Sequence, residues 1–126
     1  YTLQKYAAEI AMPMRVIISE LAAEDLARIY AYIATHHDPE AAERFKARAE
    51  EALTQVGQHP FIGPHPGWAT RHKKLRFWVI SRSSYVIYYE SKADEISIER
   101  VLDGRRDVRR VVEQGIEDAP GGEDSW

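Results

Sequence analysis

Two stretches in the first half of the chain repeat apolar residues every three or four positions, which is the spacing of an amphipathic helix. The first stretch runs from Leu21 to about Thr35 and follows Ser19, a residue type that caps helices well. The second begins at Asp38-Pro39, where a capping aspartate precedes proline at the first helical position, and it ends at Gly57. Because the link between them is short, we expect the two helices to form an antiparallel hairpin.

Alternating apolar and polar residues follow a loop rich in proline and glycine, and this alternation predicts strands. The segments are Leu75 to Ser81, Tyr85 to Glu90 and Glu95 to Leu102, and their short links favour an antiparallel meander. A β-branched run from Arg15 to Ser19 predicts a further strand ahead of the helices, and Asp107 to Gly115 suits a short final helix. We therefore expect an α+β fold: an N-terminal strand, an α-helical hairpin, a three-stranded antiparallel meander that joins the first strand in one sheet, and a short C-terminal helix.

One domain is expected, at residues 14–116, between two shorter segments. A chain of 126 residues can bury one core but hardly two. The chain starts with Tyr1, and Met12 and Met14 lie downstream, so we expect residues 1–13 to be an extension of uncertain origin. Residues 117–126 combine Pro120-Gly-Gly with several acids, which is typical of a disordered acidic tail.

The charge of the chain is mild but unevenly distributed. Residues 14–110 hold 16 Lys and Arg against 14 Asp and Glu, whereas residues 111–126 hold five acids and no base. This balance is less basic than that of a general nucleic-acid binder, and we expect no sequence-specific nucleic-acid binding by the chain alone. No apolar run approaches the roughly 18 residues of a membrane span. The absence of cysteine excludes thiolate sites and fits a cytoplasmic location, and the five histidines lack a ligand spacing, so no metal or cofactor is expected.

Guanidinium groups are concentrated where the last predicted strand ends, in the stretch Arg100–Asp107. Arginine recognises carboxylates and phosphates, so this stretch is suited to meet an anion on a partner. A structural role is equally open for Arg100, whose head group could pair with Asp107 or Asp103 beside a strand face shared with Ile96 and Ile98. The residues expected to be exposed, as a solvated face or a docking patch, are Arg105, Arg106, Arg109 and Arg110.

These features, in this order, resemble the RelE/ParE superfamily of bacterial type II toxin–antitoxin systems over about residues 14–112. The matching residues are Asp25-Leu26, Ile29, Tyr32-Ile33, Pro60-x-x-Gly63, Leu75-Arg76, Val86-Ile87-Tyr88-Tyr89, Ile96-x-Ile98-x-Arg100-Val101-Leu102 and Arg105-Arg106-Asp107. The ending is most similar to the ParE branch, which usually has histidine where this chain has Asp103.

The resemblance implies a small cytoplasmic toxin in a toxin–antitoxin hetero-oligomer, silenced by a cognate ParD-like antitoxin that wraps an extended or helical segment over it. The two branches differ in their targets. ParE-like members act on DNA gyrase, whereas RelE-like members cleave messenger RNA in the ribosome.

RelE-type cleavage would need basic groups and a tyrosine shortly after the last strand. Arg105 or Arg106 could serve as a cation, but Val111 or Val112 stands where the tyrosine would fall and cannot transfer a proton. We therefore predict a non-enzymatic gyrase inhibitor without catalytic residues. The alternative is an mRNA endoribonuclease, and an inactive binding partner is a third possibility. A histidine or tyrosine brought near Arg105 by the fold would favour the endoribonuclease. The candidates are Tyr88, Tyr89 and His72.

Two binding surfaces are expected from these considerations. The target should meet Arg105, Arg106, Arg109 and Arg110. The antitoxin should meet the helical hairpin and the outer sheet, at Leu26, Tyr30, Arg76, Trp78, Ile80 and Arg82. Strand alternation places Leu75, Phe77 and Val79 on one face, taken as core, and Arg76, Trp78 and Ile80 on the other, which a partner should cover.

Overall fold

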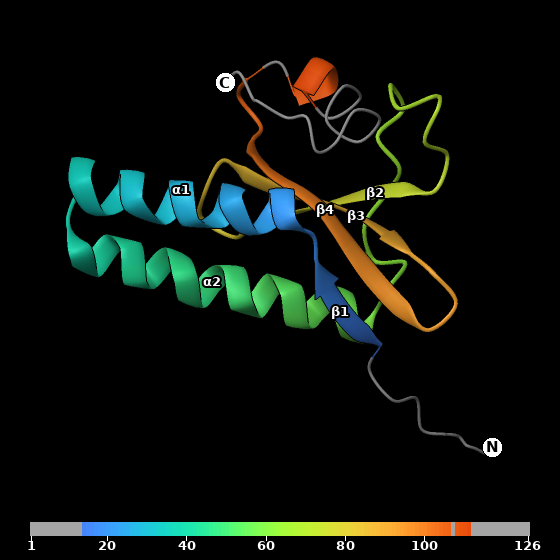
Figure 1. Ribbon diagram of the computed structural model, residues 1–126, viewed down its shortest axis with the longest axis horizontal. Helices are drawn as coiled ribbons and strands as arrows, with labels where there is room; N and C mark the ends of the chain where they lie inside the picture. Colours follow the sequence, from blue (N-terminus) through green and yellow to red (C-terminus); the bar gives the residue numbers. More distant parts are fainter. Residues whose placement is uncertain (1–13, 107, 112–126) are drawn as a thin grey trace.

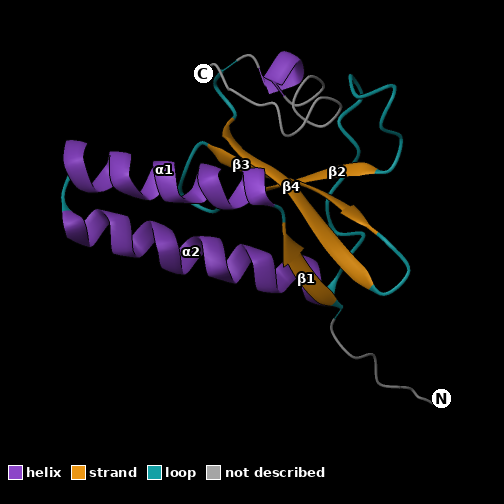
Figure 2. Cartoon of the chain, viewed as in Figure 1, coloured by secondary structure: helices purple, strands orange, loops and turns teal. Residues whose placement is uncertain are grey.

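A four-stranded sheet carries a helical hairpin on one face (Figures 1 and 2). The computed structural model describes residues 14–106 and 108–111. The elements are β1 (Arg15–Ile18), α1 (Glu20–His36), α2 (Pro39–Gln58), β2 (Leu75–Val79), β3 (Tyr85–Ser91) and β4 (Glu95–Asp103). A short helical turn at residues 108–111 follows β4. The α+β fold expected from the sequence is confirmed, whereas residues 1–13 and 117–126 lie outside the described part of the chain.

Both helices begin where the capping residues predict. The Ser19 hydroxyl accepts a hydrogen bond from the Ala22 N–H at 3.0 Å, and the Asp38 carboxylate accepts one from the Ala41 N–H at 2.7 Å. Pro39 occupies the first turn of α2, where its missing N–H costs no hydrogen bond. The short connection that results places α1 and α2 side by side (Figure 1).

The strand order in the sheet is β1-β4-β3-β2. β2, β3 and β4 form the expected antiparallel meander, and β1 joins the sheet parallel to β4, with Arg15 opposite Glu95 and Ile18 opposite Ile98. β1 pairs with only the first part of β4, because it ends at Ile18 while β4 continues to Asp103. The second half of β4 therefore has an edge that β1 does not cover.

A β-bulge in β4 changes which side chains face the helices. Tyr88 is opposite Arg100 and Tyr89 is opposite Ile98, so that Glu99 is the extra residue. Ile98 faces the helices before the bulge and Val101 faces them after it. The prediction that Arg100 shares a face with Ile98 is therefore wrong, since a bulge shifts the alternation by one residue.

The sheet is covered on both faces. The larger core lies between the sheet and the hairpin, and its buried members include Ile29, Phe45, Ala49, Val56, Ile80, Ile87, Tyr89, Ile96, Ile98 and Val101. The second core lies on the other face, and its members are Ala69, Leu75, Val86, Tyr88 and Leu102. Trp68, Phe77, Val108 and Val111 pack against this second core, so the long loop and the final helical turn cover that face.

This arrangement corrects the expected roles of the β2 faces. The alternation itself is right, and Leu75 and Phe77 belong to the second core as expected, although Val79 on the same face is 48% exposed. The correction concerns the other face, with Trp78 and Ile80, because the helices cover it. Ile80 is fully buried, and the Trp78 indole N–H donates to the Gln55 side chain at 3.0 Å. The sequence pattern identifies two faces but does not say which one packs on the hairpin.

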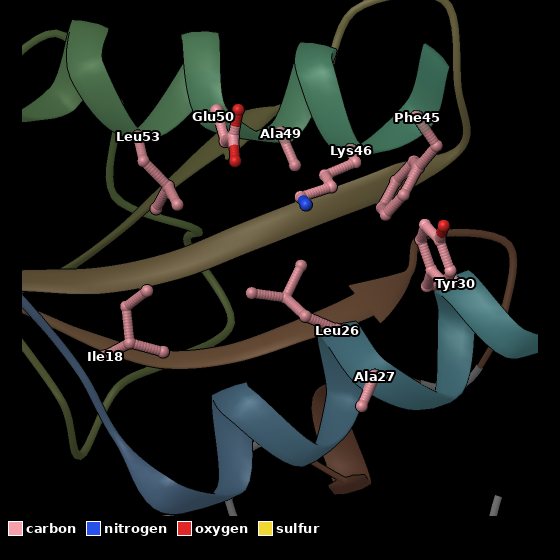
Figure 3. A pocket seen from close by; sticks show the side chains of 9 residues that line it. All are labelled: Ile18, Leu26, Ala27, Tyr30, Phe45, Lys46, Ala49, Glu50 and Leu53. Carbon is pink, nitrogen blue, oxygen red and sulfur yellow. The ribbon is translucent and has the colours of Figure 1, made fainter. Parts of the chain in front are cut away.

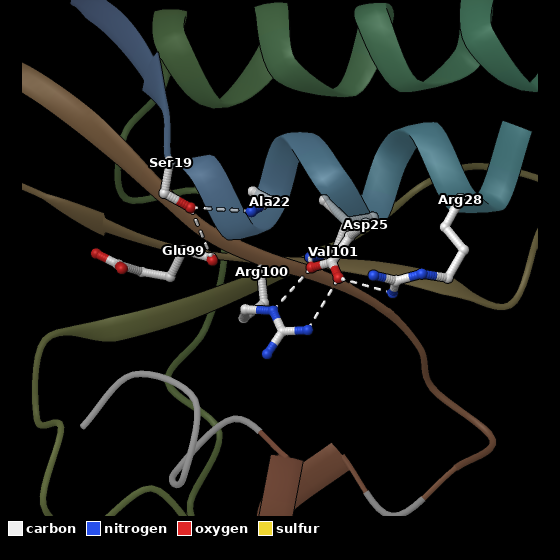
Figure 4. A network of polar contacts seen from close by, with 7 residues as sticks. All are labelled: Ser19, Ala22, Asp25, Arg28, Glu99, Arg100 and Val101. Atoms are coloured by element: carbon white, nitrogen blue, oxygen red, sulfur yellow. Dashed lines mark hydrogen bonds and ion pairs between the residues drawn. The ribbon is translucent and has the colours of Figure 1, made fainter. Parts of the chain in front are cut away.

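A buried ion pair joins α1 to the uncovered edge of β4 (Figure 4). The Arg100 guanidinium donates two hydrogen bonds to the Asp25 carboxylate, at 2.8 and 2.9 Å, and the Val101 N–H donates a third at 2.9 Å. One residue before Arg100 in β4, the Glu99 carbonyl accepts a hydrogen bond from the Ser19 hydroxyl at 3.0 Å. The side chains of Ser19 and Asp25 thus form hydrogen bonds with the β4 backbone beyond the point where its pairing with β1 ends.

The partner predicted for Arg100 is therefore corrected. Its carboxylate is that of Asp25, which is only 1% exposed, and Arg28 adds a longer ion pair to the same carboxylate at 3.6 Å. Asp103 pairs with Arg105 instead, and Asp107 lies outside the described residues. A stable pair of this kind needs both partners, because a lone charge at such a depth is strongly unfavourable.

We predict that Asp25→Ala lowers the free energy of unfolding by about 3–5 kcal/mol, because it leaves the Arg100 guanidinium buried without its carboxylate. The double variant Asp25→Ala/Arg100→Met should recover part of this loss. Urea denaturation followed by circular dichroism measures both. Glu24→Ala, at an exposed neighbouring position, should stay within about 0.5 kcal/mol of the parent. A loss of under about 1 kcal/mol for Asp25→Ala would contradict this role.

Candidate functional site

An apolar groove runs between α1 and α2 beside the end of β1 (Figure 3). It has a volume of about 500 Å³ and is lined by Ile18, Leu26, Ala27, Tyr30, Phe45, Lys46, Ala49, Glu50 and Leu53. We call it the hairpin groove. Leu26 and Leu53 are half-buried and Ile18 is 40% exposed, so the groove offers apolar surface to a partner.

The hairpin groove brings together two of the predicted antitoxin contacts, Leu26 and Tyr30. The Tyr30 hydroxyl donates to the Glu43 carboxylate, and this hydrogen bond raises the pKa of Tyr30. Lys46 and Glu50 add one charge of each sign to the α2 side of the groove. The hairpin was expected to meet the antitoxin, but no residue of α2 was named for that contact.

The other four residues predicted for the antitoxin do not line this groove. Ile80 and Trp78 belong to the core beneath the helices, as described above. Arg82 is exposed in the β2–β3 turn with a φ of 57°. The Arg76 guanidinium donates to the Gly63 carbonyl at 2.6 Å and lies 4.8 Å from the centre of the Phe61 ring. Arg76 therefore holds the loop that follows α2.

A second cavity lies where β4 ends. It measures about 260 Å³ and is lined by Arg28, Ile29, Tyr32, Tyr85, Asp103, Arg105 and Arg106. We call it the arginine cavity. It contains two of the residues predicted to meet the target, Arg105 and Arg106, while Arg109 and Arg110 are exposed on the following helical turn and do not line it. Arg28, Tyr32 and Tyr85 were missed, because only the fold brings α1 and the start of β3 to this point.

Asp103 holds Arg105 in a fixed geometry. The Arg105 guanidinium donates to both carboxylate oxygens, at 3.0 and 2.7 Å, and the Arg105 backbone N–H donates at 3.0 Å. The side-chain hydrogen bonds from Arg105 are the main reason that the pKa of Asp103 falls to about 2, against the opposing effect of burial. Because the Arg105 side chain remains 75% exposed, it still presents its charge to the surface.

Tyr85 and Asp103, two of the cavity's titratable side chains, are poorly suited to proton transfer near neutral pH. The pKa of Asp103 is about 2, and burial, followed by the Asp103 charge, raises the pKa of Tyr85. A general acid or base works best when its pKa is near the operating pH. The fold thus brings Tyr32 and Tyr85 into the cavity of Arg105, a placement that the nuclease alternative requires, although burial raises the pKa of Tyr85.

The three residues named as possible acid–base groups do not line the arginine cavity. Tyr88 is buried in the second core, where burial raises its pKa to about 12. The Tyr89 hydroxyl accepts the Gly63 N–H at 3.0 Å and donates to the Pro60 carbonyl at 2.9 Å. His72 precedes β2 and its carbonyl is 3.2 Å from the His65 ring nitrogen.

Within residues 14–106 and 108–111, no group of three or more His, Cys, Asp and Glu side chains is placed to hold a metal ion. No helix in the same ranges has the length and apolarity that crossing a bilayer requires.

We predict that Asp103→Asn destabilises the protein at neutral pH by up to about 1 kcal/mol, the usual range for a pair with one exposed partner. The folded-state pKa of Asp103 is lowered, so the stabilisation is present above about pH 4 and is lost as the pH falls toward 2. Urea denaturation at about pH 7, 4 and 3 should show the gap between parent and variant narrowing. A stability difference between parent and variant that grows in acid would contradict this prediction. The control is Asp94→Asn, in the exposed β3–β4 turn, which should differ little from the parent at each pH.

Known proteins share the sequence pattern and the fold of this chain. The family described as the ParE toxin of the type II toxin–antitoxin system parDE matches residues 16–108. Among solved structures, a chain of the chromosomal ParDE system from P. aeruginosa shares the fold, with a TM-score of 0.60 and 23% identity over 70% of this chain and 92% of that one. A search of curated protein sequences finds no match. The family match spans most of the domain, and the chain belongs to the ParE toxin family of type II toxin–antitoxin systems.

Proposed function

We propose that this toxin inhibits DNA gyrase through the arginine cavity and that a cognate antitoxin silences it by binding in the hairpin groove. The observation that carries the first part is that Arg28, Arg105 and Arg106 line one cavity, where Arg105 is paired with Asp103 and Arg28 with the buried Asp25. Three guanidinium groups with two acids, Asp103 and Asp25, leave an excess of positive charge, which is suited to a partner's carboxylates or phosphates.

Docking accounts for this surface better than catalysis does. Arg105 is already engaged by Asp103 in a bidentate pair, which fixes its direction without removing it from the surface. Tyr85 and Asp103 have pKa values displaced away from neutrality in opposite directions. An mRNA nuclease would need a proton donor or acceptor at this point, and a raised pKa makes Tyr85, like the strongly acidic Asp103, a poor one near neutral pH. A non-enzymatic toxin needs only the charge and the shape.

The hairpin groove supports the second part of the proposal. Its walls are mostly apolar side chains from two antiparallel helices, with Lys46 and Glu50 available to fix the orientation of a partner. Grooves of this kind receive the apolar face of a helix or extended segment. The solved relative comes from a ParDE toxin–antitoxin system, which accords with an antitoxin as the partner.

For the target surface, we predict that Arg106→Gln raises the toxin concentration needed for half-inhibition of gyrase supercoiling by about tenfold, the effect of losing about 1.4 kcal/mol of binding. Supercoiling of relaxed plasmid by purified gyrase is the measurement. Arg44→Gln removes the same charge from an exposed position on α2 outside the cavity and should behave as the parent. Equal potency of all three proteins would reject the arginine cavity as the target surface.

For the antitoxin surface, we predict that Leu26→Glu weakens binding of the co-expressed antitoxin at least about tenfold, because it puts a charge into an apolar groove. Calorimetry with the purified antitoxin gives the dissociation constant. Ala31→Glu introduces the same charge at an exposed position of α1 that does not line the groove, and it should leave the affinity unchanged. If Leu26→Glu binds as tightly as Ala31→Glu, the antitoxin binds elsewhere.

A further inference from the structure

The turn between β2 and β3 holds one residue in a strained backbone conformation. Arg82 has a φ of 57°, and it is the one non-glycine residue with a positive φ in the part of the chain that the structure describes. Left-handed backbone is unfavourable for residues with a Cβ atom, whereas glycine adopts it readily. Strain of this kind is concentrated at functional sites. Because the turn geometry alone favours glycine, the arginine side chain needs another explanation.

Backbone and serine hydrogen bonds hold this turn in place. The Ile80 N–H donates to the Tyr85 carbonyl at 2.9 Å, which closes the turn. The Ser83 hydroxyl donates to the Ile80 carbonyl at 2.8 Å and accepts the Tyr85 N–H at 3.0 Å. These bonds fix the backbone around Arg82 without using its side chain. The side chain is therefore available for a contact outside the turn.

The turn lies beside the arginine cavity. The Ser84 carbonyl accepts the Gly104 N–H at 2.7 Å, and Gly104 directly precedes Arg105 at the end of β4. Tyr85, the residue after Ser84, lines the cavity itself. Arg82 thus stands two residues before a hydrogen bond that joins its turn to the cavity.

Arg82 differs from the cavity arginines in the state of its charge. Arg105 is engaged by Asp103, and Arg28 pairs with Asp25. Arg82 is exposed, and no hydrogen bond or ion pair joins its guanidinium to another described residue. A paired guanidinium must share or lose its carboxylate when it binds a partner, whereas an unpaired one loses only water. Arg82 therefore adds a free positive charge beside the cavity.

The ligand that suits an isolated guanidinium is a carboxylate. Arginine binds a carboxylate through two parallel hydrogen bonds, so one such group is enough to satisfy it. A nucleic-acid backbone is bound by several cations together, and this chain has a formal net charge of -3 at pH 7. A fixed backbone also lowers the entropy lost on binding. These features favour a carboxylate on a protein over a phosphate of DNA.

We propose that Arg82 binds a carboxylate of the target protein and extends the target surface beyond the arginine cavity. The inference rests on the proposed function, because that function makes gyrase the protein that meets this side of the toxin.

Substitutions at residue 82 separate the side chain from the turn. Arg82→Gly and Arg82→Asn remove the charge but keep residue types that tolerate a left-handed backbone. Each should raise the toxin concentration for half-inhibition of gyrase supercoiling about tenfold. Arg82→Lys should lose less potency, because it keeps the charge without the two-bond geometry. Arg44→Gln, at an exposed position of α2, should match the parent.

Stability and two further binding measurements identify what Arg82 contacts. The melting temperature of Arg82→Gly should equal that of the parent or exceed it by a few degrees, because the strain is relieved. A clearly lower melting temperature would assign Arg82 to the fold and overturn the inference. Arg82→Asn should also leave unchanged both the mobility shift of plasmid DNA without gyrase and the calorimetric affinity for the antitoxin. Loss of either would assign Arg82 to phosphate or to the antitoxin, against the inference.

The supercoiling assay distinguishes failure of this inference from failure of the proposed function. If the parent inhibits gyrase and both uncharged variants inhibit it equally well, Arg82 does not meet the target, while gyrase inhibition stands. If the parent does not inhibit gyrase, the proposed function and this inference are both overturned.

Discussion

The carboxylate of Asp25 is the constraint on which the rest of the structure depends. β1 ends before β4 does, which leaves part of the β4 edge without a strand partner. There the Asp25 carboxylate accepts one hydrogen bond from the Val101 N–H and two from the Arg100 guanidinium. A buried carboxylate with this many donors fixes the position of α1 on the sheet. The geometry of both candidate sites depends on that position, because α1 supplies one wall of the hairpin groove and one wall of the arginine cavity.

The two sites therefore share a helix but offer different chemistry. Leu26 and Tyr30 face α2 in an apolar groove, whereas Arg28 and Tyr32, two residues further along in each case, line the charged cavity at the end of β4. Side chains two positions apart point to different faces of a helix, so one element serves both surfaces. An antitoxin in the groove would contact the same helix that lines the proposed target surface, so antitoxin and target would bind close to each other.

Much of this fold could be predicted from the sequence, because it is encoded locally. Ser19 and Asp38 mark helix starts through hydrogen bonds to residues three positions on, and the β2–β4 meander follows from alternation and short turns. The misses have long-range causes. The bulge at Glu99 moves Arg100 to another face, the partner of Arg100 lies 75 residues away, and only packing decides that Ile80 is covered by the hairpin. Of the residues that line the arginine cavity, Arg105 and Arg106 stand out in the sequence, whereas Arg28, Tyr32 and Tyr85 join them only in three dimensions.

The central functional claim is that the arginine cavity docks a target and does not catalyse a reaction. The most direct measurement compares two activities of the purified full-length toxin: inhibition of supercoiling by purified gyrase, and cleavage of messenger RNA during translation in a purified system. If the cavity only docks its target, supercoiling falls as toxin concentration rises while the messenger RNA stays intact. Cleavage of messenger RNA with unaffected supercoiling would contradict it.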